Sequence, residues 1–175
     1  MTGHARERGN GDLHSVVTSF YDRSVREVYG YFHRATAGDR RLAEDLTQET
    51  FMACVRAASS GLADATTMPW LMGVARHKLI DHYRRSSREE RKLSLVWSSR
   101  ADEASVDLDI TDTAAFSALA ELSAVHRLVL VLRYLDDLSV NQIADEIGKS
   151  VRATESLLVR ARQALNSIVR EANHD

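Results

Sequence analysis

Residues 139–162 read SVNQIADEIGKSVRATESLLVRAR, and this stretch has the spacing of a helix-turn-helix motif. Ser139 is placed to cap a short helix, because a hydroxyl at that position accepts from a free backbone N–H. Gly148 follows that helix where the chain needs a positive φ to turn, and Ala144 is small where the two helices must cross closely. A longer second helix is predicted over 151–170.

The beginning of this second helix contains polar and basic side chains at regular intervals. In a helix-turn-helix motif, the N-terminal residues of the second helix contact base edges in the major groove of DNA. An ordinary pair of antiparallel helices in a bundle is the alternative, and the arginines that follow favour DNA binding over it. The candidate DNA contacts here are Arg152, Thr154, Glu155, Ser156, Arg160 and Arg162.

The composition excludes several classes of protein. The 175 residues include one Pro and 8 Gly, too few turn residues for a β-rich chain. A single cysteine, Cys54, excludes an intrachain disulfide and a cysteine-based zinc site, the histidines show no metal spacing, and no cofactor is expected. The longest aliphatic run, 128–132, is far shorter than the ~20 residues of a membrane span. The N-terminus has no apolar signal sequence, so we expect a cytoplasmic protein.

Shifts in composition divide the chain into four parts. Residues 1–11 are polar and are expected to form a disordered N-terminal tail. Residues 12–92 and 113–175 show helical periods of apolar side chains. Between them, 93–112 has a net charge of −4 and no helical period, which is typical of a flexible linker. The predicted fold class is therefore all-α, with two small helical domains joined by a flexible acidic linker.

The net charge of −2, taken alone, argues against a protein that binds nucleic acid. The charge is unevenly distributed, however, because 76–92 and 149–170 each have a net charge of +4. One such cluster alone is as typical of a solvated helix face as of a contact with a polyanion. Two such clusters in separate domains on one tether favour two contacts with a single polyanion.

Several stretches of the sequence resemble a known family of proteins. The sequences HRLVLVLRY (126–134) and RAR (160–162), with the helix-turn-helix between them, resemble region 4 of bacterial sigma factors. The sequence DRRLAEDLTQETF (39–51) resembles the polymerase-binding helix of region 2, and 70–85 resembles the helix that meets the −10 element. A short chain with these two regions and no others is similar to sigma factors of the extracytoplasmic-function (ECF, group 4) type.

The resemblance implies an alternative sigma factor, which is not an enzyme but a subunit that directs core RNA polymerase to promoter DNA. Region 2 would dock on the clamp helices of the largest subunit, and region 4 on the flap of the second-largest subunit. An anti-sigma factor is a further partner of this kind of protein. The spacing of four polar residues places them on one helix face suited to a basic partner: Glu44, Asp45, Gln48 and Glu49.

The resemblance also assigns DNA contacts. Region 2 would melt the −10 element and hold an unstacked base between its helix and the following loop, which by position is 86–91. The side-chain types that this requires are present in Arg76, His77, Tyr83, Arg84, Arg85 and Arg88. Region 4 would read the −35 element as duplex. The chain departs from the family pattern at His77, where asparagine is common, and at Glu155, where a basic residue is frequent.

The sequence also leaves other functions open as alternatives. A stand-alone helix-turn-helix regulator would use 1–92 to bind a ligand or to dimerise, and would bind duplex DNA without polymerase. An anti-sigma or adaptor protein is a third class. An enzyme is disfavoured, because the sequence has no nucleophile–base pair and no glycine-rich phosphate loop.

Overall fold

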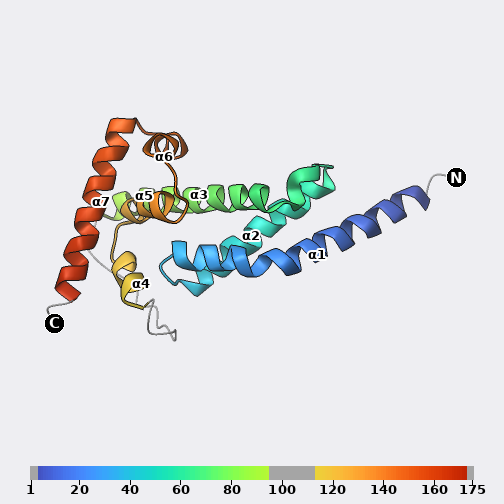
Figure 1. Ribbon diagram of the computed structural model, residues 1–175, viewed down its shortest axis with the longest axis horizontal. Coiled ribbons are helices and arrows are strands. Elements are labelled where there is room, and N and C mark those ends of the chain that lie inside the picture. The colour runs from blue at the N-terminus through green and yellow to red at the C-terminus, as the bar shows by residue number, and fades with distance from the viewer. Residues whose placement is uncertain (1–3, 95–112, 173–175) are drawn as a thin grey trace. The chain divides into compact units, whose positions relative to one another are not determined.

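The computed structural model describes residues 4–94 and 113–172, and within these residues it contains helices and no strands (Figure 1). The predicted all-α class is therefore confirmed. Backbone contacts divide the chain into two compact units. The first consists of Met1–His33 and Arg40–Leu79, and the second of Arg34–Asp39 and Ile80–Asp175. This division passes through a helix, whereas the predicted boundaries follow shifts in composition and helical period.

The first unit is built from three long helical segments around an apolar core. Phe32, Leu71 and Leu79 are fully buried in it, and the rings of Tyr21 and Phe51 meet edge to face at 4.7 Å. The order of its elements is α1 (His4–Ala35), α2 (Arg40–Ser59), the 3-10 helix η1 (Ala63–Thr66) and the first part of α3 (Met68–Ser94).

Two helices extend beyond their predicted bounds. Helix α1 begins at His4, whereas 1–11 was expected to be disordered. Helix α3 continues through 86–91, where a loop was expected, and ends at Ser94. In both cases an existing helix is prolonged, which is far less costly than nucleating a new one. The rest of the predicted linker, 95–112, lies outside the described residues.

The second unit contains the four C-terminal helices. In Figure 1, α6 lies at the N-terminal end of the long helix α7, and α5 also packs against α7. Arg127 caps the C-terminal end of α4, the first of these helices, because its guanidinium donates to the carbonyls of Leu119 (2.7 Å) and Ala120 (2.6 Å). The helices are α4 (Thr113–Ala120), α5 (Ala124–Tyr134), α6 (Val140–Ile147) and α7 (Val151–Ala172).

The helix-turn-helix has the local structure that its sequence predicts. The Ser139 side chain accepts from the Gln142 N–H at 3.3 Å, while the Ser139 N–H donates to Gln142 Oε1 at 2.9 Å. These reciprocal bonds form a capping box. Gly148 adopts φ +66°, and the next N–H, of Lys149, donates to Ala144 O at 2.9 Å. The turn between the helices is thus held by hydrogen bonds within the motif.

Candidate nucleic-acid and partner interfaces

The outer face of α7 carries most of the predicted duplex contacts. Arg152, Glu155, Ser156 and Arg160 are exposed. The Ser156 hydroxyl donates to Arg152 O at 3.0 Å, and Arg160 Nε donates to Ser156 O at 3.3 Å. These bonds hold the side chains along the helix surface, where they remain open to a partner. The first two turns of α7 therefore present a cation, a carboxylate and a hydroxyl on one side.

Thr154 does not belong to this face. Its side chain is fully buried, and its hydroxyl donates to Ser150 O at 3.1 Å. The residues one and two turns away on the inner side, Leu158 and Ala161, are buried as well. The structure corrects the expectation that Thr154 contacts DNA, because its one donor is used within the helix and no part of it reaches solvent.

Arg162 lies on a different side of α7 from Arg160, since two residues along an α-helix turn by about 200°. It borders an apolar groove of about 560 Å³ in the second unit, far from the exposed start of the helix. Tyr134 in this groove is 64% exposed, a high value for a large aromatic side chain. The apolar lining is formed by Leu119, Leu130, Val131, Tyr134, Leu135, Leu165 and Val169.

The predicted −10 contacts are spread along α3. His77, Arg85 and Arg88 are exposed, and Arg76 is partly buried. His77 Nδ1 lies 2.8 Å from Gly73 O, and a carbonyl can only accept, so this nitrogen carries the hydrogen. In the neutral ring the outward nitrogen, Nε2, is then an acceptor. Arg84 is also exposed, and it donates to Glu146 O at 2.5 Å within the second unit.

Tyr83 is a core residue and not part of this surface. It is 2% exposed, its hydroxyl donates to Ala35 O at 2.7 Å, and the Arg127 guanidinium lies 5.9 Å from its ring centroid. Burial raises the pKa of Tyr83 to about 12. A ring covered on all sides has no face for a base, so the expectation that Tyr83 stacks on DNA is corrected.

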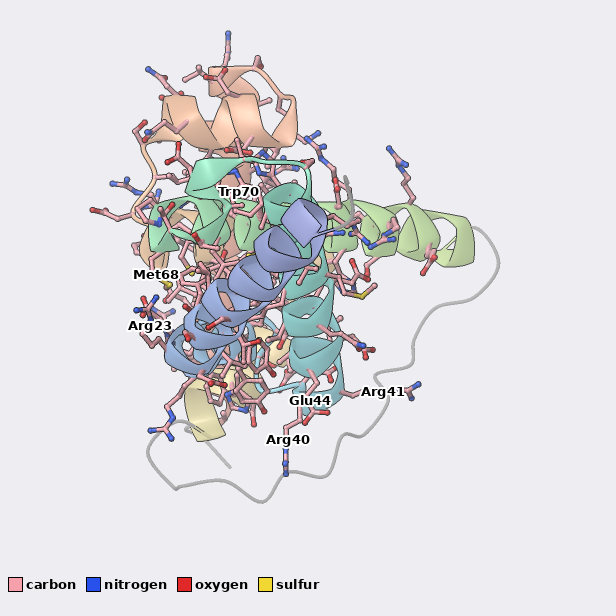
Figure 2. All side chains as sticks on the ribbon, turned by 90° about the vertical axis from the view of Figure 1, so that its right-hand side faces the viewer. Arg23, Arg40, Arg41, Glu44, Met68 and Trp70 are labelled. Carbon is pink, nitrogen blue, oxygen red and sulfur yellow. The ribbon has the colours of Figure 1, made fainter. Side chains whose placement is uncertain are left out.

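The predicted polymerase-binding residues divide between two sides of α2. Glu44 and Gln48 border a groove of about 820 Å³ in the first unit. Figure 2 shows Glu44 near the N-terminal end of α2, close to Arg40 and Arg41. The groove has an apolar lining with side chains that are unusually open to solvent, Met52 at 50% and Val55 at 46% exposed. Its other apolar residues are Tyr21, Val25, Tyr29 and Phe51.

The remaining two residues, Asp45 and Glu49, lie about 100° farther round α2 and do not line the groove. Asp45 is exposed. Glu49 is half-buried, and its Oε2 atom is 3.1 Å from Lys78 Nζ on α3. The sequence counts Lys78 in the basic cluster 76–92 but does not reveal its pairing with Glu49, because a pair separated by 29 positions on two helices leaves no periodic signal.

The other chemically notable groups have structural roles. Cys54 is buried, and its thiol donates to Ala65 O at 2.9 Å. Within residues 4–94 and 113–172, no group of His, Cys, Asp or Glu side chains is arranged to hold a metal ion. The helices of this described part are also too short or too polar for any of them to cross a membrane.

Comparison with known proteins identifies two regions of the chain. The family model for Sigma-70 region 2 matches residues 20–89, and that for Sigma-70, region 4, matches 102–165. The ECF RNA polymerase sigma factor SigL of Mycobacterium tuberculosis is 32% identical over 162 residues, 90% of each chain. SigM of Bacillus subtilis, also an ECF sigma factor, is 27% identical over 91% of this chain and 99% of its own.

Among solved structures, the sigma factor RpoE of Bartonella quintana, in complex with the anti-sigma factor NepR, has a similar fold. The TM-score is 0.51 at 21% identity, and the match covers 94% of this chain and 98% of RpoE. Two family models in the expected order and a relative above 30% identity over nearly its whole length establish the family. The chain belongs to the ECF RNA polymerase sigma factors, which bind core RNA polymerase and direct it to specific promoters.

Proposed function

We propose that the groove between α1 and α2 is the surface on which the clamp helices of the largest polymerase subunit dock. The observation that carries this assignment is the combination of exposed apolar side chains, Met52 and Val55, with Glu44 and Gln48 at the border. Apolar surface exposed beside polar side chains is typical of a protein interface. Arg26 and Arg56 also line the groove. The partner that fits is therefore an amphipathic helix with a base opposite Glu44 and acids opposite the two arginines.

The groove of the second unit is the proposed site for the flap of the second-largest subunit. It is apolar, and Arg34 and Arg162 at its border favour a partner with acidic side chains. This assignment moves Arg162 from the −35 contacts to the polymerase contacts. An anti-sigma factor would act most simply by covering the same two grooves, since both are open in this chain.

The two DNA-reading surfaces are the exposed faces of α3 and α7. On α3, His77, Arg85 and Arg88 are proposed to contact the −10 element, with Arg76 and Arg84 beside them. On α7, an inserted helix would place the four exposed residues Arg152, Glu155, Ser156 and Arg160 toward the −35 duplex. On this proposal the chain acts through its polymerase and DNA contacts, without bond chemistry of its own.

Reversing the charge of Glu44 tests the polymerase assignment. Glu44→Lys is expected to weaken binding to core polymerase about tenfold, roughly 1.4 kcal/mol, because it places a cation opposite a basic partner. Binding is measured by titrating labelled full-length chain with core enzyme. Run-off transcription with sequencing of the 5′ ends then identifies the promoters used. Asp64→Lys is the control, since Asp64 is exposed in the same unit but outside the groove. Equal losses in the two variants would contradict the assignment.

Removing the carboxylate of Glu155 tests the reading of the −35 element. A carboxylate in the major groove accepts from cytosine N4 and repels phosphate. Glu155→Ala holoenzyme is therefore expected to lose about 1–3 kcal/mol of discrimination at one −35 base pair, while overall affinity rises slightly. Binding is measured to a panel of −35 variants of a promoter mapped by run-off. Asp145→Ala, an exposed acid on α6, serves as the control. An unchanged base profile for Glu155→Ala would exclude a role in base choice.

A further inference from the structure

The second unit contains a small pocket in which cations from both basic segments of the sequence meet. Its volume is about 330 Å³, near the lower limit for sites that bind small ligands. Arg84 and Arg88 of the segment 76–92 line it from α3, and Lys149 of the segment 149–170 lines it from the turn after α6. The two segments, which the sequence predicts to contact one polyanion, thus contribute to one pocket within this unit.

The pocket wall on α3 is one face of the helix. Arg84, Ser87 and Arg88 are spaced i, i+3 and i+4, so their side chains lie on the same side. Ser87 adds a hydroxyl, which can donate to or accept from a ligand oxygen. Apolar walls beside these groups strengthen the field of the cations, because they keep water away from them. The remaining lining is formed by Tyr83, Val125, Leu128 and Ile147.

Arg84 is held in place by the backbone of the helix-turn-helix. Its Nη2 atom donates to Glu146 O at 2.5 Å, and a Cβ added to Gly148 would lie 4.0 Å from the same nitrogen. A guanidinium has five N–H donors, so this hydrogen bond orients the group and leaves donors for a ligand. The Asp81 carboxylate is 3.9 Å from Nη1, but it is 65% exposed and does not line the pocket. Such an exposed pair is weak and does not neutralise the site.

The pocket gathers positive charge without a carboxylate to balance it. Among the described residues, none of those that line it is acidic, and no carboxylate of this part of the chain pairs with Arg88 or Lys149. Both side chains are exposed and therefore accessible to a ligand. Three like charges around one recess repel one another, and an anion between them relieves this repulsion. Two of the three are arginines, whose planar donors match the oxygens of a phosphate group.

We propose that this pocket binds the terminal phosphate or diphosphate group of a small molecule. Arg84 and Arg88 contact the phosphate oxygens from α3, and Lys149 supplies the third cation from the turn. The apolar side chains contact the rest of the ligand. A bound ligand covers two arginines that are assigned above to the −10 element or lie beside it, so it competes with −10 DNA. This competition rests on the function proposed for α3, whereas the binding itself does not.

Calorimetric titration of the full-length chain with pyrophosphate, at constant low ionic strength, tests the site. Lys149→Gln is expected to weaken pyrophosphate binding about tenfold, because it removes one charge-assisted hydrogen bond. Arg170→Gln is the matched control, since it removes an exposed cation of the same unit that does not line the pocket, and it should bind pyrophosphate as the wild type does. Absence of binding to the wild type, or equal losses in the two variants, overturns the proposal.

A second probe, dimethyl phosphate, separates a terminal phosphate group from the DNA backbone. Dimethyl phosphate is a singly charged diester, as each backbone phosphate is, whereas pyrophosphate carries several charges on terminal oxygens. The three cations are expected to bind dimethyl phosphate about tenfold more weakly than pyrophosphate. Equal affinity for the two probes would overturn the proposal and make the pocket a contact for the DNA backbone.

Displacement of a fluorescent single-stranded oligonucleotide that carries a mapped −10 sequence tests the competition. At equal ionic strength, pyrophosphate is expected to weaken oligonucleotide binding several-fold in the wild type and less in Lys149→Gln. Equal weakening in the two proteins would overturn the competition. Failure of the −10 assignment is recognised separately, from Arg85→Gln measured without pyrophosphate. Arg85 is an exposed cation of α3 outside the pocket lining, and an unchanged oligonucleotide affinity in this variant contradicts that assignment.

Discussion

Replacing Phe32 by alanine is expected to lower the free energy of unfolding by about 3–5 kcal/mol. The Phe32 side chain is 0% exposed in the core of the first unit. Its loss removes the apolar transfer energy of the ring and leaves a cavity that neighbouring helices fill only in part. A domain of this size is stable by only about 5–15 kcal/mol. The substitution therefore removes a large share of the total, and we expect a fraction of the chain to be unfolded at 37 °C.

Urea unfolding followed by circular dichroism measures this loss. Tyr134→Ala is the matched control, because it also deletes an aromatic ring, but from a side chain that is 64% exposed. The control is expected to change the free energy of unfolding by no more than about 0.5 kcal/mol. Losses of similar size in both variants would contradict the assignment of Phe32 to the core.

Alkaline pH is expected to destabilise the protein through Tyr83. Burial raises the pKa of its hydroxyl from 10.0 to about 12. The unfolded chain therefore releases this proton at a lower pH than the folded chain does. The stabilisation is fully present below pH 10 and is lost as the pH rises toward 12 and beyond. A shift of two units corresponds to about 2.7 kcal/mol in all.

Urea unfolding between pH 8 and pH 12 measures the effect, with Tyr83→Phe as the comparison. The variant keeps the ring but loses the hydroxyl that donates to Ala35 O. At pH 8 it should be less stable than the wild type by about 1 kcal/mol, the value of one hydrogen bond. Above pH 10 its stability should fall less steeply, so that the two curves converge. Parallel curves would show that the Tyr83 hydroxyl is not buried in the folded state.

The fold was predictable wherever local signals decide it. The Ser139 cap and the positive φ of Gly148 depend on residues within one motif, and both were placed from sequence. The bounds of α1 and α3 were not predictable from single residues. The two serines at 86 and 87 are weak helix formers, but the charged residues after them favour helix strongly enough for α3 to continue.

The interfaces were predictable in part. Periodicity places Tyr83 and Thr154 on the inner sides of their helices, so the helical register alone excludes both from the DNA contacts. The division of the acidic face of α2 was not accessible in this way. It depends on Lys78 reaching across from another helix and on Met52 remaining uncovered, and both are consequences of tertiary packing.

The self-contained turn of the helix-turn-helix has an evolutionary consequence. Its hydrogen bonds are made by Ser139, Gln142, Ala144 and Lys149, whereas the residues that face outward from α7 take no part in them. The residues that fix the fold of the turn and the residues that recognise DNA are therefore encoded by separate codons. Mutations at Arg152, Glu155 or Ser156 can therefore change the −35 sequence that is recognised while the fold of the motif is preserved. A duplicated gene of this kind has a short path to controlling a different set of genes.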